Sequence, residues 1–205
     1  MTKLLYIEAS PRKKRSSSIA VAKTFLDMYR KTNPQDEIVT LDLWQKELPP
    51  FDGDVIDAKY AIMHGETKTA EQVKAWKKVE ALIDEFKSAD KYLFSLPMWN
   101  FGVPYKLKHY IDLLVQPGYA FVVENGAYKG LITNKKVTLV YARGGSYEAG
   151  NVLDLQKPYM ETILAFIGFK NFSSIIIQPT LESPEAKKKS LDAAHATAKS
   201  LAPQF

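Results

Sequence analysis

Short apolar segments alternate with amphipathic ones along almost the whole chain, and this alternation constrains the fold more than any other feature. Apolar residues recur at helical spacing in the longer stretches, for example across residues 73–86 and 159–166. Five short segments are rich in branched and aromatic residues, as buried strands are: 3–9, 37–43, 91–96, 136–142 and 172–178. This alternation predicts an α/β fold in which right-handed crossover helices cover a parallel sheet.

Five strands with short loops at their carboxyl ends predict a doubly wound, flavodoxin-like sheet of order 2-1-3-4-5. In that order a ligand crevice lies between the first and third strands, at their carboxyl ends. Two insertions interrupt the alternation of strands and helices. Residues 44–70 are expected to contain one helix of their own, and residues 117–131 to form a small hairpin turning at Asn125 and Gly126. No repeat or linker marks a boundary, so we expect a single domain over residues 1–205.

Any redox activity in this chain needs a borrowed cofactor, because the sequence contains no cysteine. Disulfides, thiol redox chemistry and cysteine-ligated metal sites are therefore excluded. His64, His109 and His195 show no metal-ligand spacing, so no metal site is expected. His109 lies one helical turn beyond Tyr105 in a predicted helix, where a structural role fits it better than a catalytic one.

The net charge of +5 raises the question of a nucleic-acid partner. The lysines lie mostly on polar helix faces beside acids, as solvated residues do, so we expect no nucleic-acid binding. A basic surface would instead attract anionic small molecules. No apolar run reaches bilayer length and the first ten residues lack a signal-peptide pattern, so we expect a soluble, cytoplasmic protein without a membrane partner.

The loop after the first strand, residues 10–18, has hydroxyl groups where nucleotide-binding loops usually have glycines. Ser16, Ser17 and Ser18 stand at the start of a predicted helix, where free N–H groups and the helix dipole favour a phosphate. Ser10 faces them across the turn. The alternative is that a serine here only caps the helix and that the basic residues beside it form a solvated loop.

The loop after the third strand places large apolar side chains among turn-forming residues. Met98, Trp99 and Phe101 would offer a flat apolar contact to a ring system, and Asn100 a polar group for its hydrogen-bonding edge. The alternative is that Trp99 and Phe101 plug the end of the core. After the fourth strand, Ala142–Gly145 supplies two glycines that allow close backbone approach and the permanently charged Arg143. All three loops fall on one edge of one sheet.

With these motifs in place, the chain resembles the FMN-dependent NADH azoreductases, which also act as NADH:quinone oxidoreductases, in the flavodoxin-like superfamily. The resemblance covers essentially the whole chain. It is carried by Ser10 and the later serines, by PMWNFGVPYKLKHYID (97–112), PGYAF (117–121), ENGAYKGL (124–131), ARGG (142–145) and FIGF (166–169). Members often have tyrosine at the position of Trp99, which still stacks, and a hydroxyl residue at the position of Ala142, which removes a possible side-chain contact to the flavin.

The resemblance implies a homodimer with one FMN per subunit, each site lying near the subunit interface. The implied FMN contacts are Ser10, Ser16, Ser17, Ser18, Met98, Trp99, Asn100, Phe101, Ala142, Arg143, Gly144 and Gly145. It also implies that Tyr119, Phe121 and Phe166 lie near the substrate side of the ring.

The implied activity is hydride transfer from NADH to FMN, followed by two-electron reduction of a quinone, azo compound or nitroaromatic in the same pocket. The choice of NADH over NADPH stays open. No residue is required as a catalytic acid, since water can supply a proton. We expect cationic or N–H groups of the Ala142–Gly145 segment beside the flavin pyrimidine.

Two other functions occur on this type of sheet. An FMN electron carrier of the flavodoxin type is usually strongly acidic, whereas this chain is basic and carries two insertions that suit a substrate pocket. A receiver-type signalling module needs clustered acids for Mg²⁺ at the ends of the first and third strands. Glu8 is the only acid there, so the signalling alternative is discarded.

Overall fold

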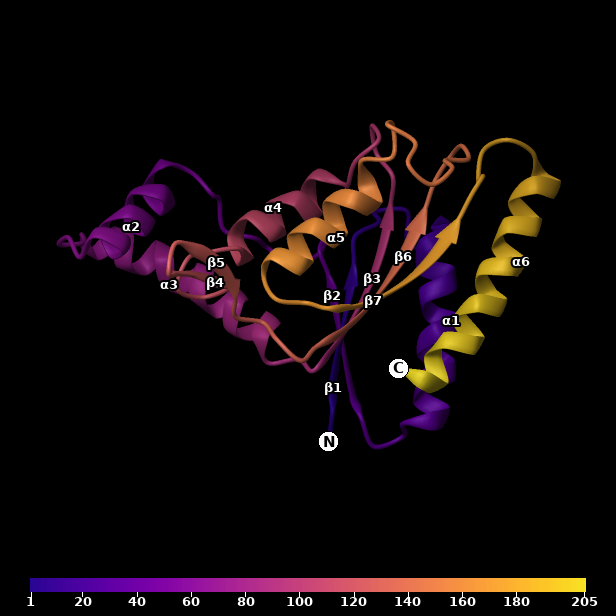
Figure 1. Ribbon diagram of the computed structural model, residues 1–205, viewed down its shortest axis with the longest axis horizontal. Coiled ribbons are helices and arrows are strands. Elements are labelled where there is room, and N and C mark those ends of the chain that lie inside the picture. Colours follow the sequence, from indigo (N-terminus) through magenta and orange to yellow (C-terminus); the bar gives the residue numbers. More distant parts are fainter.

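The computed structural model describes residues 1–205, and a five-stranded parallel sheet forms its central layer (Figure 1). Neighbouring strands follow the order β2-β1-β3-β6-β7, and all four pairs are parallel. The strands are β1 (Lys3–Glu8), β2 (Glu37–Asp42), β3 (Lys91–Pro97), β6 (Lys136–Ala142) and β7 (Asn171–Ile177). The five predicted segments thus form the five strands of this sheet.

A separate two-stranded hairpin accounts for the gap in strand numbering. Its strands are β4 (Phe121–Glu124) and β5 (Ala127–Gly130), which pair antiparallel. Asn125 and Gly126 form the turn with positive φ angles of 53° and 77°. The predicted hairpin and its turn are confirmed. When the sheet strands alone are counted along the chain, their spatial order is the predicted 2-1-3-4-5.

Helices cover both faces of the sheet (Figure 1). α1 (Ser17–Thr32) and α6 (Pro184–Leu201) lie side by side on one face. On the other face lie α3 (Ala70–Lys87), α4 (Tyr105–Leu114) and α5 (Gln156–Phe166). Short 3-10 turns occupy Lys13–Arg15 and Ala202–Gln204.

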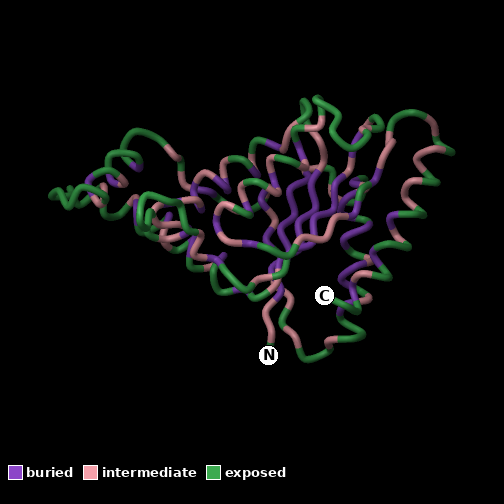
Figure 2. Tube along the Cα trace, viewed as in Figure 1, coloured by how far each residue is buried: buried purple, intermediate pink, exposed green.

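The core is divided by the sheet into two hydrophobic clusters. Alternate residues of β1 enter opposite clusters: Leu5 and Ile7 pack with α3, α4 and α5, whereas Leu4 and Tyr6 pack with α1 and α6. Figure 2 shows the buried part of the chain trace concentrated in the sheet strands. Strands buried on both faces explain the continuous apolar runs in the sequence.

The insertion after β2 contains one helix, α2 (Gly53–His64), as predicted. Its N-terminus is capped by Asp52, and it packs against α3 at one end of the molecule, far from α6 (Figure 1). None of the helices combines the length and the apolar character that crossing a bilayer requires.

Candidate functional site

The loops that follow β1, β3 and β6 lie together at the carboxyl edge of the sheet. The amide nitrogen of Ala9 donates to the carbonyl oxygen of Ser95 at 3.0 Å, and that of Met98 donates to the carbonyl oxygen of Ala142 at 2.8 Å. These bonds continue the strand pairing beyond the ends of the strands. The structure therefore brings together the three loops that the sequence singled out.

The loop after β1 leads into α1 and caps its N-terminus. Ser16 is the N-cap, and its Oγ accepts from the amide of Ile19 at 3.4 Å and lies 3.1 Å from the Oγ of Ser18. Ser10 is buried, and its Oγ accepts from the amide of Arg12 at 3.3 Å. The amides of Ser17 and Ser18 donate to no protein group. Ser16 thus has the capping role of the alternative interpretation, while two N–H groups stay free for an anion.

One basic residue of this loop is bound by acids. Lys13 Nζ pairs with Glu8 Oε1 at 2.8 Å and with Asp42 Oδ2, at the ends of β1 and β2. Burial lowers the pKa of Lys13, but the bonds to Asp42 and Glu8 outweigh burial and raise its pKa above the ordinary value. The three other basic residues of the loop, Arg12, Lys14 and Arg15, form no ion pair. They line a cavity of about 400 Å³, whose remaining lining residues are Ser16, Ser17, Ala20, Lys187, Leu191 and His195.

The loop after β3 is a tight hairpin turn. Trp99 and Gly102 exchange backbone hydrogen bonds of 3.1 and 2.9 Å, and between them Asn100 and Phe101 have positive φ angles of 46° and 67°. Trp99 is 36% exposed and Phe101 42% exposed. Neither side chain plugs the core, so the alternative interpretation of these two residues is wrong. The turn instead presents apolar surface to solvent at the sheet edge.

Trp99 is supported by aromatic residues that the sequence interpretation missed. The Trp99 ring centroid lies 5.8 Å from that of Trp44 and 6.5 Å from that of Tyr105. Trp44 is fixed in turn, because its indole N–H donates to the carbonyl oxygen of Ala9 at 3.0 Å. Its place directly after the second strand was the available signal, since the carboxyl ends of all five strands meet at this edge.

The loop after β6 turns its backbone, rather than its arginine side chain, toward a ligand. The amides of Gly144, Gly145 and Ser146 donate to no protein group. A Cβ atom on Gly144 would lie 2.9 Å from Leu181 Cδ1, so the segment that follows β7 comes close to the loop here. The guanidinium of Arg143 is 1% exposed and donates to Asp154, Gln156 and Gln178. The sequence analysis expected cationic or N–H groups of this segment beside a ligand, and in the structure the N–H groups are free whereas the cation is already paired.

A cavity of about 600 Å³ joins the second and third of these loops. Of the predicted FMN contacts, five line this cavity: Met98, Asn100, Phe101, Gly144 and Gly145. Trp99, Ala142, Arg143 and the four serines lie outside its lining. The cavity has three further lining residues that were not predicted: Tyr147, Leu181 and Glu182. They follow the fourth and fifth sheet strands, which is where the parallel topology directs other lining residues.

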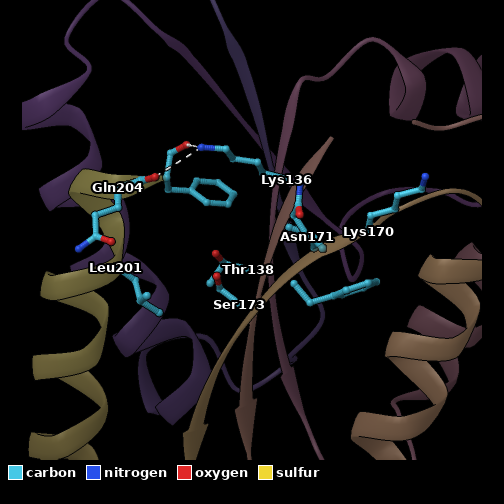
Figure 3. A pocket seen from close by; sticks show the side chains of 10 residues that line it. Lys136, Thr138, Lys170, Asn171, Ser173, Leu201 and Gln204 are labelled. Atoms are coloured by element: carbon cyan, nitrogen blue, oxygen red, sulfur yellow. Dashed lines mark hydrogen bonds between the residues drawn. The ribbon is translucent and has the colours of Figure 1, made fainter. Parts of the chain in front are cut away.

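A third cavity, of about 380 Å³, lies at the opposite, amino edge of the sheet (Figure 3). There Lys136 Nζ donates to the carbonyl oxygen of Phe205 at 3.0 Å, and Thr138 and Ser173 lie side by side on neighbouring strands. This cavity contains none of the predicted site residues. The candidate site is therefore at the carboxyl edge.

The three aromatic residues predicted on the substrate side lie apart from the carboxyl-edge cavity of the same chain. Tyr119 OH donates to Glu80 Oε1 at 2.6 Å and accepts from Trp76 Nε1 at 3.1 Å. Phe121 and Phe166 contact each other, with ring centroids 4.7 Å apart. All three belong to the region of the hairpin and α5, and none lines the cavity.

Comparison with known proteins identifies the family. A family model described as flavodoxin-like fold matches residues 2–202. The chain is 47% identical, over its full length and 98% of the relative, to a protein of Desulfotalea psychrophila named FMN-dependent NADH:quinone oxidoreductase. The chain belongs to the FMN-dependent NADH:quinone oxidoreductase family. A relative of the same name in Nitratidesulfovibrio vulgaris is 43% identical over 88% of both chains.

Solved structures agree with this assignment to the NADH:quinone oxidoreductase family. The crystal structure of an azoreductase from Bacillus anthracis str. Sterne superposes with a TM-score of 0.92, at 31% identity over 100% of both chains. An FMN-dependent NADH-azoreductase from Bacillus anthracis str. Ames Ancestor, in complex with FMN, gives 0.86 at 26% identity over 98% of this chain and 100% of that one. The resemblance inferred from the sequence is confirmed.

The residues present at the carboxyl edge fit a flavin. The ring of a flavin is flat and apolar with one polar, hydrogen-bonding edge, and this site pairs an exposed aromatic turn with a turn whose amides are free. The free N–H groups at the start of α1 fit the phosphate. The chemistry of the donor set therefore matches the cofactor of the family.

Proposed function

We propose that this chain is an FMN-dependent oxidoreductase that carries two electrons from NADH to quinones and azo compounds. One observation carries the proposal: the Met98–Ala142 hydrogen bond joins an exposed aromatic turn to a turn with free amides around a single cavity. Full-length relatives bear the name of this activity, and azoreductases share the fold.

In this proposal different groups of the predicted site residues bind different parts of the cofactor. Ser10 and the amides at the start of α1 hold the phosphate, with Ser16, Ser17 and Ser18 around it. Met98–Phe101 provide the contact to the ring, and the backbone of Ala142–Gly145 meets its polar edge. When bound, FMN supplies the capacity to take a hydride equivalent from NADH and to release two electrons to the acceptor.

The residues of the chain bind and orient the cofactor and exclude water from the site. No side chain is assigned as an acid or base. His109 is bound elsewhere, because its Nε2–H donates to the carbonyl oxygen of Pro49 at 2.9 Å. His64 is exposed on α2, and His195 Nδ1 lies 2.8 Å from the Oγ1 of Thr24. Histidine is the usual proton-transfer residue near neutral pH, so a proton for the acceptor comes from water in this proposal.

We further propose that the active form is a homodimer. Tyr119, Phe121 and Phe166 lie apart from the cavity of their own chain, and the hairpin beside them exposes Val123 and Tyr128. A second copy would allow the hairpin region of one subunit to approach the cavity of the other. Nitroaromatics are included as further acceptors of the same site, since they are flat as quinones and azo compounds are.

Steady-state kinetics tests the proposal against the electron-carrier alternative. The purified chain is mixed with FMN, NADH and a simple benzoquinone, and NADH oxidation is followed by absorbance. Turnover without any partner protein is expected. A chain that binds FMN tightly but oxidises NADH no faster than free FMN does would support the carrier, and a chain that binds no FMN would exclude both functions.

A further inference from the structure

A buried ion pair lies beside the glycines that line the candidate cavity. Arg143 Nη2 lies 2.8 Å from Asp154 Oδ2 and 3.0 Å from Asp154 Oδ1. Arg143 Nε donates to Gln156 Oε1 at 3.3 Å, and Nη1 donates to Gln178 Oε1 at 3.2 Å. The guanidinium is thus surrounded by acceptors of the protein itself, and its charge is balanced by a carboxylate.

These acceptors come from three different segments of the carboxyl edge. Asp154 precedes α5, Gln156 is the first residue of α5, and Gln178 directly follows β7. One side chain therefore ties the loop after β6 to the next helix and to the last strand. The backbone of Arg143 is tied as well, because Thr180 Oγ1 donates to its carbonyl oxygen at 2.8 Å.

The same network reaches the far end of the loop. Gln178 Oε1 accepts from the amide of Tyr147 at 3.3 Å, and Gln178 Nε2 donates to the carbonyl oxygen of Tyr147 at 3.1 Å. Tyr147 lines the cavity, as Gly144 and Gly145 do. The segment that carries the free amides is therefore fixed at both ends by Arg143 and Gln178. Between these ends, the carbonyl oxygen of Gly144 also accepts from the amides of Thr180 and Leu181 at 3.0 and 3.1 Å.

We propose that Arg143 is a positioning residue that holds the free amides of Gly144 and Gly145 against the flavin, and that its charge does not act on the flavin directly. The inference rests on the proposed function. Preorganised donors favour negative charge where it develops, and reduction adds negative charge to the ring. Held in place, these amides therefore strengthen FMN binding and raise the midpoint potential of the bound cofactor.

Three variants separate positioning from a direct effect of charge. Arg143→Met removes a positive charge, Asp154→Asn removes a negative charge, and Gln178→Leu changes no charge. If Arg143 positions the loop, all three lower FMN affinity, on the order of tenfold to a hundredfold, because hydrogen bonds to charged groups are lost. All three also lower the midpoint potential. A direct effect of charge would lower the potential in Arg143→Met, raise it in Asp154→Asn and leave it unchanged in Gln178→Leu.

The experiment measures the FMN dissociation constant by fluorescence quenching and the midpoint potential by dye equilibration, for wild type and each variant. Circular dichroism and thermal unfolding of the cofactor-free proteins establish that each variant folds. If Arg143→Met does not fold, Asp154→Asn and Gln178→Leu still decide between the two models. Asp192→Asn is the matched control, because it breaks the exposed pair of Lys188 and Asp192 on α6 and should behave as wild type.

The wild-type titration separates this inference from the proposed function. Wild type that binds no FMN would remove the proposed function itself. Wild type that binds FMN, with Asp154→Asn and Gln178→Leu unchanged in affinity and potential, would overturn only the positioning role. Equal-signed falls in affinity and potential for the oppositely charged variants would support it.

Discussion

The amide of Met98 donates to the carbonyl oxygen of Ala142 at 2.8 Å. The register of β3 and β6 ends at the pair Pro97 and Ala142, so this bond adds one more rung beyond the sheet. It joins the turn that presents Trp99 and Phe101 to the segment that presents Gly144 and Gly145. The two halves of the candidate ring site are therefore one structural unit, and changes on either side should affect the same ligand.

Asn100→Gly is expected to weaken FMN binding by about 1 to 3 kcal/mol, through loss of an amide that meets a polar edge of the ring. Glycine is the appropriate replacement, because Asn100 has a φ of 46°. Asn100→Ala would add a backbone strain of about 1 to 2 kcal/mol. Fluorescence-quenching titration gives the affinity, and an unchanged dissociation constant for Asn100→Gly would show that the side chain points away from the ligand.

Ser16→Asp should separate helix capping from phosphate binding. Aspartate caps helices as well as serine does, so the stability of the cofactor-free protein should stay within about 0.5 kcal/mol of wild type. Its charge should nevertheless repel the phosphate and lower FMN affinity at least tenfold, a loss of about 1.4 kcal/mol. Thr69→Asp, at the N-cap of α3, is the control and should leave FMN affinity unchanged. Normal affinity in Ser16→Asp would contradict phosphate binding at this position.

Gly130→Ala is expected to destabilise the fold by about 3 kcal/mol. A Cβ atom at this position would lie 2.3 Å from the backbone nitrogen of Gly168, and backbone cannot move aside as a side chain can. Gly53→Ala is the matched control, because nothing lies within 4 Å of its added Cβ at the start of α2. Urea unfolding should place Gly53→Ala within about 0.5 kcal/mol of wild type. Similar stability of the two variants would refute the close contact.

Asp36→Asn should destabilise the protein at neutral pH and have little effect in strong acid. A hydrogen bond from Tyr29 lowers the pKa of Asp36 below its ordinary value of 3.8, with further contributions from the amide of Thr2 and from Lys91. A lowered carboxyl pKa stabilises the fold fully above the unfolded value, and this stabilisation is lost as pH falls through the folded value.

Urea unfolding of wild type and Asp36→Asn at pH 7 and at about pH 2 measures this effect. At pH 7 the variant should lose about 1 to 3 kcal/mol, the contribution of hydrogen bonds to a charged group. Near pH 2 the two proteins should approach each other in stability. A difference that is the same at both pH values would show that the carboxylate charge does not matter.

The fold followed from the sequence because its main signals are local. The apolar runs of β1, β3 and β6 and the Asn125–Gly126 turn each specify their own structure, and parallel topology then places the three loops at one edge. The long-range partners had no such signal. Nothing near Arg143 in the sequence indicates that Gln178 accepts from its guanidinium. The sequence therefore left open whether this segment offers a cation or N–H groups to a ligand, and in the fold the cation is a buried ion pair.

The ion pairs of Lys13 in the loop after β1 bear on whether the cofactor can be removed and replaced. Carboxylates of Glu8 and Asp42 bind its ammonium group and so fix the backbone there, which has a φ of 47°, through protein contacts alone. We therefore expect this loop to keep the same conformation with and without bound cofactor. We expect that flavin can be stripped from the protein and loaded again while the chain stays folded.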